Sequence, residues 1–287
     1  LIKTGCIDPS SCFLFCLHLL NLVNWTGEEM KTASVNKHDL MQHAQQDMQK
    51  WISDLDLTDR QKLALTCRIL FDHGHDAGLA GQITCRSENK ETFITQRFGL
   101  GFDEITASNL LEVNQDLEPI NQEGMANPAN RFHTWIYKEH PEVNCIIHTH
   151  PTYVAALSML QIPLMISQMD VCALYEDCSF VGHWPGVPVG NEEGILISSA
   201  LGKNRAVLLS HHGQLVTGKT IEEACNLALL IERAAQLQLL AMSSGQIQPI
   251  PHALAAEAHD WVSTDKRNKV NFAYYARKAL KKHSDCI

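Results

Sequence analysis

The apolar run from Ile221 to about Met242 restricts the possible folds of this chain more than any other feature. Thr220 and Glu223 stand in the order of a capping box, which predicts a helix that begins at Ile221. Apolar side chains occupy nearly every face of this helix. It therefore has to be buried between layers of structure or between subunits.

Short apolar strands alternate with helical segments over the rest of the chain. The segment LTDRQKLALTCRILFDHG predicts a helix with Thr58 as its N-cap. The segments GLAGQITCRS, ETFIT, VNCIIHTH and RAVLLS predict strands. Further helices are expected at about 130–139, at Thr152–Met159, at 192–201, from near Thr106, and once in the tail around NFAYYARKAL. This alternation favours an α/β fold whose sheet is covered by helices on both faces.

Composition limits the possible partners. With 45% hydrophobic and 19% charged residues, the chain has the makeup of a globular protein with a sizeable core. The net charge of -9 argues against a broad binding surface for nucleic acid or for an anionic membrane, so neither is expected as a partner. The ten cysteines are scattered, which we interpret as reduced thiols of a cytoplasmic protein. Cys145, Cys172 and Cys225 are expected to be buried.

The first 29 residues differ in character from the remainder. The apolar run at 12–23 is interrupted by polar residues and is shorter than the roughly 20 residues that a membrane-spanning helix needs. We interpret residues 1–29 as an upstream extension of the reading frame and expect translation to start at Met30. The main domain is expected over 30–245. A helical tail at 246–287 is expected to pack on this domain or on a neighbouring subunit.

Two histidines close the predicted strand VNCIIHTH. Side chains on a strand alternate between its faces, so His148 and His150 are expected to project to the same side. Two imidazoles side by side suit adjacent corners of a metal coordination sphere. The alternative is a pair of partly exposed histidines that are hydrogen-bonded at a strand end.

A second histidine pair follows the strand RAVLLS, where the sequence continues HHG and offers His211 and His212. Three neutral imidazoles with an open coordination position form a common catalytic zinc site. The same ligands also suit Fe(II), Mn(II) or Co(II).

Four segments together resemble the class II aldolase/adducin family, which includes fuculose-phosphate aldolase, ribulose-phosphate epimerase and related decarboxylases. They are GLGFDEITASNLLEV, NPANRFHTWIYKEHPEV, EVNCIIHTHP and LLSHHGQLVTGKTIEEA, in the family's order, within roughly Leu57 to Met242. The resemblance implies His148, His150 and His212 as ligands of a divalent metal, zinc in the first place; His211 takes a position where relatives usually have asparagine. It also implies a three-layer α/β/α fold with a central, largely antiparallel sheet, and a homotetramer with active sites at subunit interfaces.

Two departures from the family pattern bear on the reaction. Family aldolases carry a proton-transferring glutamate four residues before the histidine of RFHTWIY, where this chain has Ala129. Their phosphate-binding turn Gly-Thr-Ser-Gly-Asn is here GLAGQ, so two hydroxyl donors are missing. A neutral or carboxylate substrate is therefore favoured over a sugar phosphate. The predicted substrate contacts are Gly81, Gln82, Arg97 and Asn130. Arg97 would clamp a carboxylate, and a solvated loop arginine is the alternative.

The predicted activity is that of a metal-dependent lyase of the aldolase/decarboxylase type, acting on a small oxygenated carbonyl compound or hydroxy acid. Decarboxylation is compatible with Ala129 because it needs no base to start. The candidate acids that would protonate the resulting enolate are His183 and Tyr175, for each of which ordinary loop packing is the alternative.

Three other functions remain open. The segment GQLVTGKT fits the phosphate-binding loop pattern of nucleotide hydrolases, but its Leu-Val-Thr run favours an extended strand over a glycine-rich cradle. A non-catalytic module like the adducin head shares the family motifs, although adducins continue into a long tail for which the residues after the long helix leave little room. A non-haem iron oxygenase on the same scaffold would also use three histidines.

Overall fold

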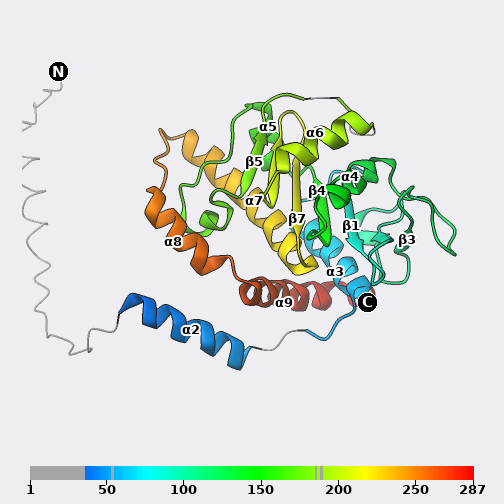
Figure 1. The fold of residues 1–287 in the computed structure, drawn as a ribbon, viewed down its shortest axis with the longest axis horizontal. Helices are drawn as coiled ribbons and strands as arrows, with labels where there is room; N and C mark the ends of the chain where they lie inside the picture. Colours follow the sequence, from blue (N-terminus) through cyan, green and yellow to red (C-terminus); the bar gives the residue numbers. More distant parts are fainter. Residues whose placement is uncertain (1–35, 53–54, 185, 188–189) are drawn as a thin grey trace, which may run out of the picture. The chain divides into compact units, whose positions relative to one another are not determined.

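The computed structural model describes residues 36–287, apart from 53–54, 185 and 188–189. The predicted extension at 1–29 lies outside these described residues. The chain divides into one unit at 1–45 and another at 46–287, and α2 (Lys37–Trp51) begins in the first. The elements described below all belong to the second unit (Figure 1). None of the described helices is long and apolar enough to cross a membrane.

The described strands form one open sheet of seven strands in the order β3-β2-β1-β4-β7-β6-β5. Their bounds are β1 Gln82–Arg86, β2 Phe93–Thr95, β3 Leu111–Val113, β4 Cys145–Thr149, β5 Cys178–Val181, β6 Ala206–Leu209 and β7 Gln214–Gly218. Every neighbouring pair is antiparallel except β5 with β6. The predicted α/β fold with a largely antiparallel sheet is therefore confirmed.

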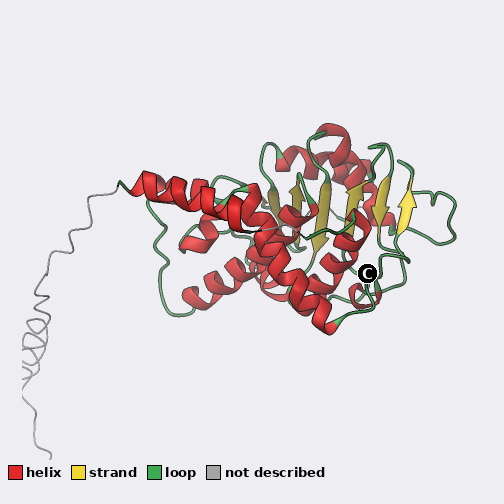
Figure 2. Ribbon diagram, turned by 90° about the horizontal axis from the view of Figure 1, so that it is seen from below, coloured by secondary structure: helices red, strands yellow, loops and turns green. Residues whose placement is uncertain are grey.

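Helices cover both faces of the sheet, as Figure 2 shows. One face packs against α3 (Asp59–Asp72), α5 (Thr152–Met159), α7 (Ile221–Met242) and α9 (Asp265–Lys282), and this layer forms the first core. The other face packs against α4 (Arg131–Glu139) and α6 (Asn191–Leu201), which form the second core. Because a sheet with two apolar faces needs a helix layer on each, the two cores account for the three-layer arrangement.

The long helix α7 begins and ends where the sequence predicts, but its capping box is only half formed. The Thr220 hydroxyl accepts a hydrogen bond from the Glu223 amide. The Glu223 carboxylate accepts from the Lys219 amide and pairs with Arg205, instead of returning to the Thr220 amide. The salt bridge to Arg205 thus ties the start of α7 to the segment before β6. The segment proposed as a phosphate cradle forms β7, so the strand interpretation of Leu215–Val216–Thr217 is confirmed.

Two predicted helices differ from the structure. No helix starts at Thr106: Thr106 and Asn109 form a single hydrogen-bonded turn, and the chain then enters β3. Pairing of Leu111 and Val113 with β2 buries both side chains, which outweighs the local helical pattern. The tail contains two helices instead of one, α8 (His252–Val262) and α9, because the Thr264 hydroxyl caps a new helix.

Candidate metal centre

Strand β4 determines the direction in which His148 points. Ile147 packs in the first core and Ile146 in the second, so the alternation of the strand directs His148 toward the α4 layer. The ring of Phe132 on α4 meets the His148 ring edge-on, with centroids 5.2 Å apart. Only 1% of His148 is exposed, so packing holds this imidazole in place.

The other two imidazoles come from segments that leave the sheet. His150 follows Thr149, the last residue of β4, and His212 lies in the turn between β6 and β7. Gly213 brings these two segments into contact. A Cβ atom at position 213 would lie 2.5 Å from Cδ2 of His150 and 2.5 Å from the carbonyl oxygen of Thr149. Glycine is therefore required for the approach of the turn to the end of β4.

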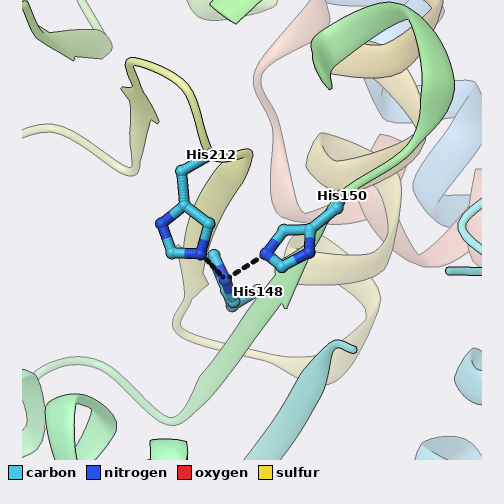
Figure 3. Close-up of side chains that lie close together, drawn as sticks. All are labelled: His148, His150 and His212. Carbon is cyan, nitrogen blue, oxygen red and sulfur yellow. Dashed lines mark hydrogen bonds between the residues drawn. The ribbon is translucent and has the colours of Figure 1, made fainter. Parts of the chain in front are cut away.

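The three imidazoles converge through their Nε2 atoms. Nε2 of His148 lies 2.8 Å from Nε2 of His150 and 3.2 Å from Nε2 of His212. The nearest ligand atoms of all three lie within 4.8 Å of one another. Figure 3 shows the three rings turned toward one another from the end of β4 and the neighbouring turn. Among the described residues, this is the one group of histidine, cysteine or acidic side chains with metal-ligand spacing.

The tautomer of His148 follows from a main-chain contact. Its Nδ1 atom lies 2.8 Å from the carbonyl oxygen of Gln214, which can only accept a hydrogen bond. Nδ1 must therefore carry the proton, and Nε2 presents its lone pair to the other two rings. A backbone carbonyl that accepts from the distal nitrogen is the usual partner of a metal-binding histidine.

All three imidazoles are held in the neutral form. Burial, together with the neighbouring His212 and His150 rings, holds the pKa of His148 well below its ordinary value. Burial and the His150 ring lower the pKa of His212 to about 4, and burial also lowers the pKa of His150. Neutral imidazole is the form that binds a metal. Three neutral imidazoles whose Nε2 atoms converge are a ligand set that suits a divalent cation.

A buried chain of polar groups lies on α4 and β1, which the sequence analysis did not single out. Nδ1 of His133 is 2.8 Å from Oγ1 of Thr84, and Oγ1 of Thr84 is 2.9 Å from Oη of Tyr137. Burial lowers the pKa of His133 to about 3, and its Nε2 atom is buried without a partner among the described residues. The available signal was the spacing of His133 and Tyr137, which places both on one helical face.

Two of the predicted substrate contacts are buried polar side chains, Gln82 on β1 and Asn130 immediately before α4. Gln82 is the direct strand partner of His148, so their side chains share a face of the sheet. Asn130 donates a hydrogen bond from Nδ2 to Oγ1 of Thr95 across 3.0 Å. The Oε1 atom of Gln82 and the Oδ1 atom of Asn130 are buried without a partner among the described residues. Both are acceptors, which suits a ligand that presents hydroxyl or other donor groups.

The other two, Gly81 and Arg97, line one small pocket beside the end of β4. Gly81 has a φ of +136°, and a Cβ atom there would lie 3.4 Å from the carbonyl oxygen of His148. Leu79 and Phe98 line the same pocket and are 48% and 41% exposed. Arg97 makes no ion pair with any of the described residues. The pocket thus combines apolar side chains with the Arg97 guanidinium and with polar groups, among them the Asp76 carboxylate, which accepts a hydrogen bond from the Gly78 amide.

The two candidate proton donors occupy opposite ends of β5. This strand runs parallel to β6, so the end of β5 lies level with the end of β6 that leads to His212. His183 follows β5 at this end and is exposed. Tyr175 precedes β5, and its hydroxyl contacts Nδ1 of His252 and lies 3.2 Å from Oε1 of Glu176. Within one chain, the fold does not bring Tyr175 to the histidine group.

His211 points away from the group that its neighbour joins. Its φ of +54° is left-handed, a conformation in which asparagine and histidine are more common than most residues. Its Nε2 atom lies 2.6 Å from Nε2 of Gln161, which is in the turn directly after α5. The turn therefore directs the two adjacent histidines to different neighbours.

Comparison with known proteins gives one family match. The model of the class II aldolase and adducin N-terminal domain matches residues 61–239. The chain is 30% identical over 222 residues to the meiotically up-regulated gene 14 protein of Schizosaccharomyces pombe, covering 74% of this chain and 86% of that protein. It is 29% identical over 181 residues to the decarboxylase NovR of Streptomyces niveus, covering 62% of this chain and 67% of that protein.

Among solved structures, the L-fuculose 1-phosphate aldolase of Glaciozyma antarctica superposes with a TM-score of 0.74. The two chains are 32% identical, and the match covers 79% of this chain and 90% of the aldolase. The family model spans the seven described strands and the segments that carry the three histidines.

Proposed function

This chain belongs to the class II aldolase and adducin family, and from that premise we propose that it is a metal-dependent lyase of the aldolase/decarboxylase type. The observation that carries the proposal is the convergence of three neutral imidazoles through Nε2, with the tautomer of His148 fixed by Gln214. The proposed substrate is a small oxygenated carbonyl compound or a hydroxy acid.

In this proposal His148, His150 and His212 hold a divalent metal ion. Zinc fits three imidazoles that leave a coordination position open, and Fe(II), Mn(II) or Co(II) suit the same ligands. When bound, such an ion polarises a carbonyl or hydroxyl oxygen and stabilises the enolate that forms when a carbon–carbon bond breaks. The chain contributes by keeping the imidazoles neutral and the His148 ring oriented.

The pocket beside β4 supports an acid as the substrate in preference to a sugar phosphate. In the turn that ends at Gly81, Leu79 and Ala80 stand where family aldolases carry hydroxyl side chains. Arg97 adds a guanidinium group, whose paired N–H donors match the two oxygens of a carboxylate. Gln82 and Asn130 remain proposed substrate contacts because the Oε1 atom of Gln82 and the Oδ1 atom of Asn130 are acceptors without a partner among the described residues.

Decarboxylation fits the residues around the histidines better than aldol cleavage. Ala129 cannot take a proton from a substrate hydroxyl, whereas loss of CO₂ requires no base. The enolate still has to be protonated, and His183 is the proposed acid because it follows β5 at the end of the sheet that carries His212. Tyr175 remains a candidate only as a residue supplied by a second subunit. The exposed position of His183 makes it the first residue to replace.

The assembly and the compartment are proposed on separate grounds. Family resemblance supports a homotetramer with active sites between subunits. The described cysteines are all free thiols, and most are buried, which supports a reducing compartment such as the cytoplasm. Size measurement in solution by light scattering tests the tetramer directly.

Elemental analysis followed by a substrate screen tests the proposed activity. The purified full chain is analysed for Zn, Fe, Mn and Co, and then incubated with a panel of keto and hydroxy acids while released CO₂ and aldehyde are measured. We expect the protein to contain zinc and to release either CO₂ or an aldehyde. A chelator should remove the zinc and stop the release. A metal-loaded protein that releases neither product from any acid would contradict the lyase proposal.

A non-catalytic binding module is the second candidate, and Ala129 is the observation that favours it. The family includes adducin domains, so the shared fold does not by itself imply turnover. Bound iron together with oxygen consumption in the same screen would indicate an iron oxygenase instead of a lyase. Metal bound without any turnover would favour the binding module.

A further inference from the structure

The position of His150 is not fixed by the sheet that carries its neighbour. The last residue of β4 is Thr149, so His150 lies beyond the strand and outside the β4–β7 register. Pro151 follows and has no N–H to donate. It also serves as the N-cap of α5 without any side-chain hydrogen bond. Something other than the strand or a local cap must hold the segment that carries this imidazole.

Glu232 on α7 provides that restraint, because α7 packs beside α5 in the same helix layer. Its Oε1 atom accepts a hydrogen bond from the amide of Tyr153 and its Oε2 atom from the amide of Val154, each across 2.9 Å. These amides belong to the first turn of α5, whose N–H groups have no partner within the helix. One carboxylate thus replaces the cap that Pro151 cannot supply, only three residues after His150.

The chemistry of Glu232 indicates that these two contacts are its purpose. Only 9% of the residue is exposed, and it makes no ion pair with the described residues. Burial raises the pKa of its carboxyl group, which the two amides partly offset. Burying a carboxylate is costly unless it is hydrogen-bonded, and here each oxygen receives a hydrogen bond from one of two adjacent amides.

On this basis we infer that Glu232 is a positioning residue for the metal centre, which fixes His150 by capping α5 through the Tyr153 and Val154 amides. The inference rests on the proposed function, because it concerns how the proposed metal ligand is held. Contact with Gly213 restrains the His150 ring from the other side. Without the Glu232 cap, only the contact with Gly213 restrains the segment that carries His150.

Two replacements at this position have different expected effects. Glu232→Ala removes both acceptors. Glu232→Gln keeps the shape and one acceptor, but turns an amide donor toward one of the two N–H groups. A partner bonded directly to a metal ligand is worth about 10- to 100-fold in metal affinity, and Glu232 acts one step further out through the main chain, so the lower end of that range applies. We expect a loss of about tenfold or more in Glu232→Ala and a smaller loss in Glu232→Gln.

Gln238 offers a matched control on the same helix. It is 2% exposed, accepts from the Met165 amide across 2.8 Å and donates to the Pro163 carbonyl across 3.0 Å. Like Glu232, it ties α7 to main-chain groups of the segment after β4, but these groups lie beyond α5. Gln238→Ala should therefore lower the stability of the fold without changing metal affinity.

The test uses the full chain with Co(II) as the probe. Affinity is measured by competition with a chromophoric chelator, and the visible spectrum of bound Co(II) reports the ligand geometry. Hydrogen exchange of the Tyr153 and Val154 amides, measured without metal, shows whether the cap is lost. Faster exchange, weaker Co(II) binding and an altered spectrum in both Glu232 variants, with Gln238→Ala unchanged in affinity and spectrum, support the inference.

Three other outcomes overturn the inference, and they show whether the proposed function falls with it. If the unmodified chain binds Co(II) stoichiometrically and the Glu232 variants bind it with the same affinity and spectrum, the positioning role is wrong and the proposed function stands. The same holds if Gln238→Ala weakens binding as much as Glu232→Ala. If the unmodified chain binds no Co(II), the proposed function fails first and the role of Glu232 fails with it. Should Glu232→Ala not fold, Glu232→Gln decides between these results.

Discussion

The Nδ1 atom of His148 donates a hydrogen bond to the main-chain carbonyl of Gln214 across 2.8 Å, and this contact links one imidazole to the pairing of two strands. Gln214 is the first residue of β7 and is paired with Thr149 on β4. A change in this register would remove both the acceptor and the orientation of the ring. The histidine group is therefore a product of the sheet and not of the loops alone.

The close approach at Gly213 makes a specific prediction for Gly213→Ala. The new Cβ atom would lie 2.5 Å from both the His150 ring and the Thr149 carbonyl, so one of these has to move. Overpacking of this kind costs about 1 to 3 kcal/mol of stability. We also expect metal affinity to fall, because the ring that moves belongs to the proposed ligand set. Urea unfolding and metal titration measure the two effects.

Gly182→Ala is the matched control for this substitution. A Cβ atom at position 182 would meet only the Phe180 ring, at the ordinary contact distance of 3.5 Å. Stability and metal affinity close to those of the unmodified chain are expected. Equal metal affinity in Gly213→Ala and Gly182→Ala would show that the approach of the β6–β7 turn does not position His150.

The buried, neutral His133 makes the free energy of unfolding depend on pH. The pKa of His133 is about 3 in the fold and near 6.5 in the unfolded chain. Between these values the unfolded state binds the extra proton, so stability is full above about pH 6.5 and falls as the pH decreases toward 3. The loss is about 1.4 kcal/mol per pH unit for this one group.

Replacement by an amide removes this titration. For His133→Asn we expect a stability curve between pH 6.5 and 4.5 whose slope is lower by about 1.4 kcal/mol per unit. Equilibrium unfolding in urea at several pH values, on metal-free protein, gives the slope. An unchanged slope would mean that His133 is protonated or accessible in the fold.

The left-handed conformation of His211 separates its role from that of His212. Asparagine tolerates a φ of +54° as well as histidine does, so His211→Asn should change stability by less than about 0.5 kcal/mol and retain its metal. A β-branched residue does not, and His211→Val is expected to cost about 1 to 2 kcal/mol. Thermal unfolding with metal analysis checks both, and loss of metal in His211→Asn would make this residue a ligand.

Arg97 is predicted to affect substrate binding and not the metal. Removing a charge-assisted hydrogen bond costs about 1.5 to 3 kcal/mol, so kcat/KM for an acid substrate should fall about 10- to 100-fold in Arg97→Gln. Metal content should not change. Arg131→Gln is the control, because this arginine is a partly exposed residue of α4 that does not line the pocket beside β4. Equal kinetics in the two variants would favour a solvated role for Arg97.

Much of the fold could be predicted because local and long-range preferences agree. The apolar run at Ile221 and the N-cap at Thr58 both begin helices where the sequence predicts. At Thr106 they disagree: the local pattern suits a helix, whereas Leu111 and Val113 complete the edge of the sheet. Only the pairing partner decides such a case, and the sequence does not identify that partner.

The candidate site was predictable where strand periodicity and family resemblance overlap. Both indicate His148 and His150, and the resemblance adds His212 from a segment far along the chain. The contacts that hold these rings were not predictable. Glu232 and Gln214 are distant in sequence from the residues they restrain. Glu232 belongs to none of the quoted segments, and Gln214 acts through its main-chain carbonyl, which no side-chain motif reveals. The position of Tyr175 was not predictable either. It lies at the end of β5 away from His212, and this follows only from the parallel pairing of β5 with β6.

The three-histidine centre is tested by the metal content of the full chain and of single histidine variants, measured by elemental analysis after extensive dialysis. We expect stoichiometric divalent metal in the unmodified chain and in His43→Ala, whose side chain is exposed on α2. We expect loss of the metal in His148→Ala and in His212→Ala, with folding retained by circular dichroism. Stoichiometric metal in both of these folded variants would contradict the three-histidine centre.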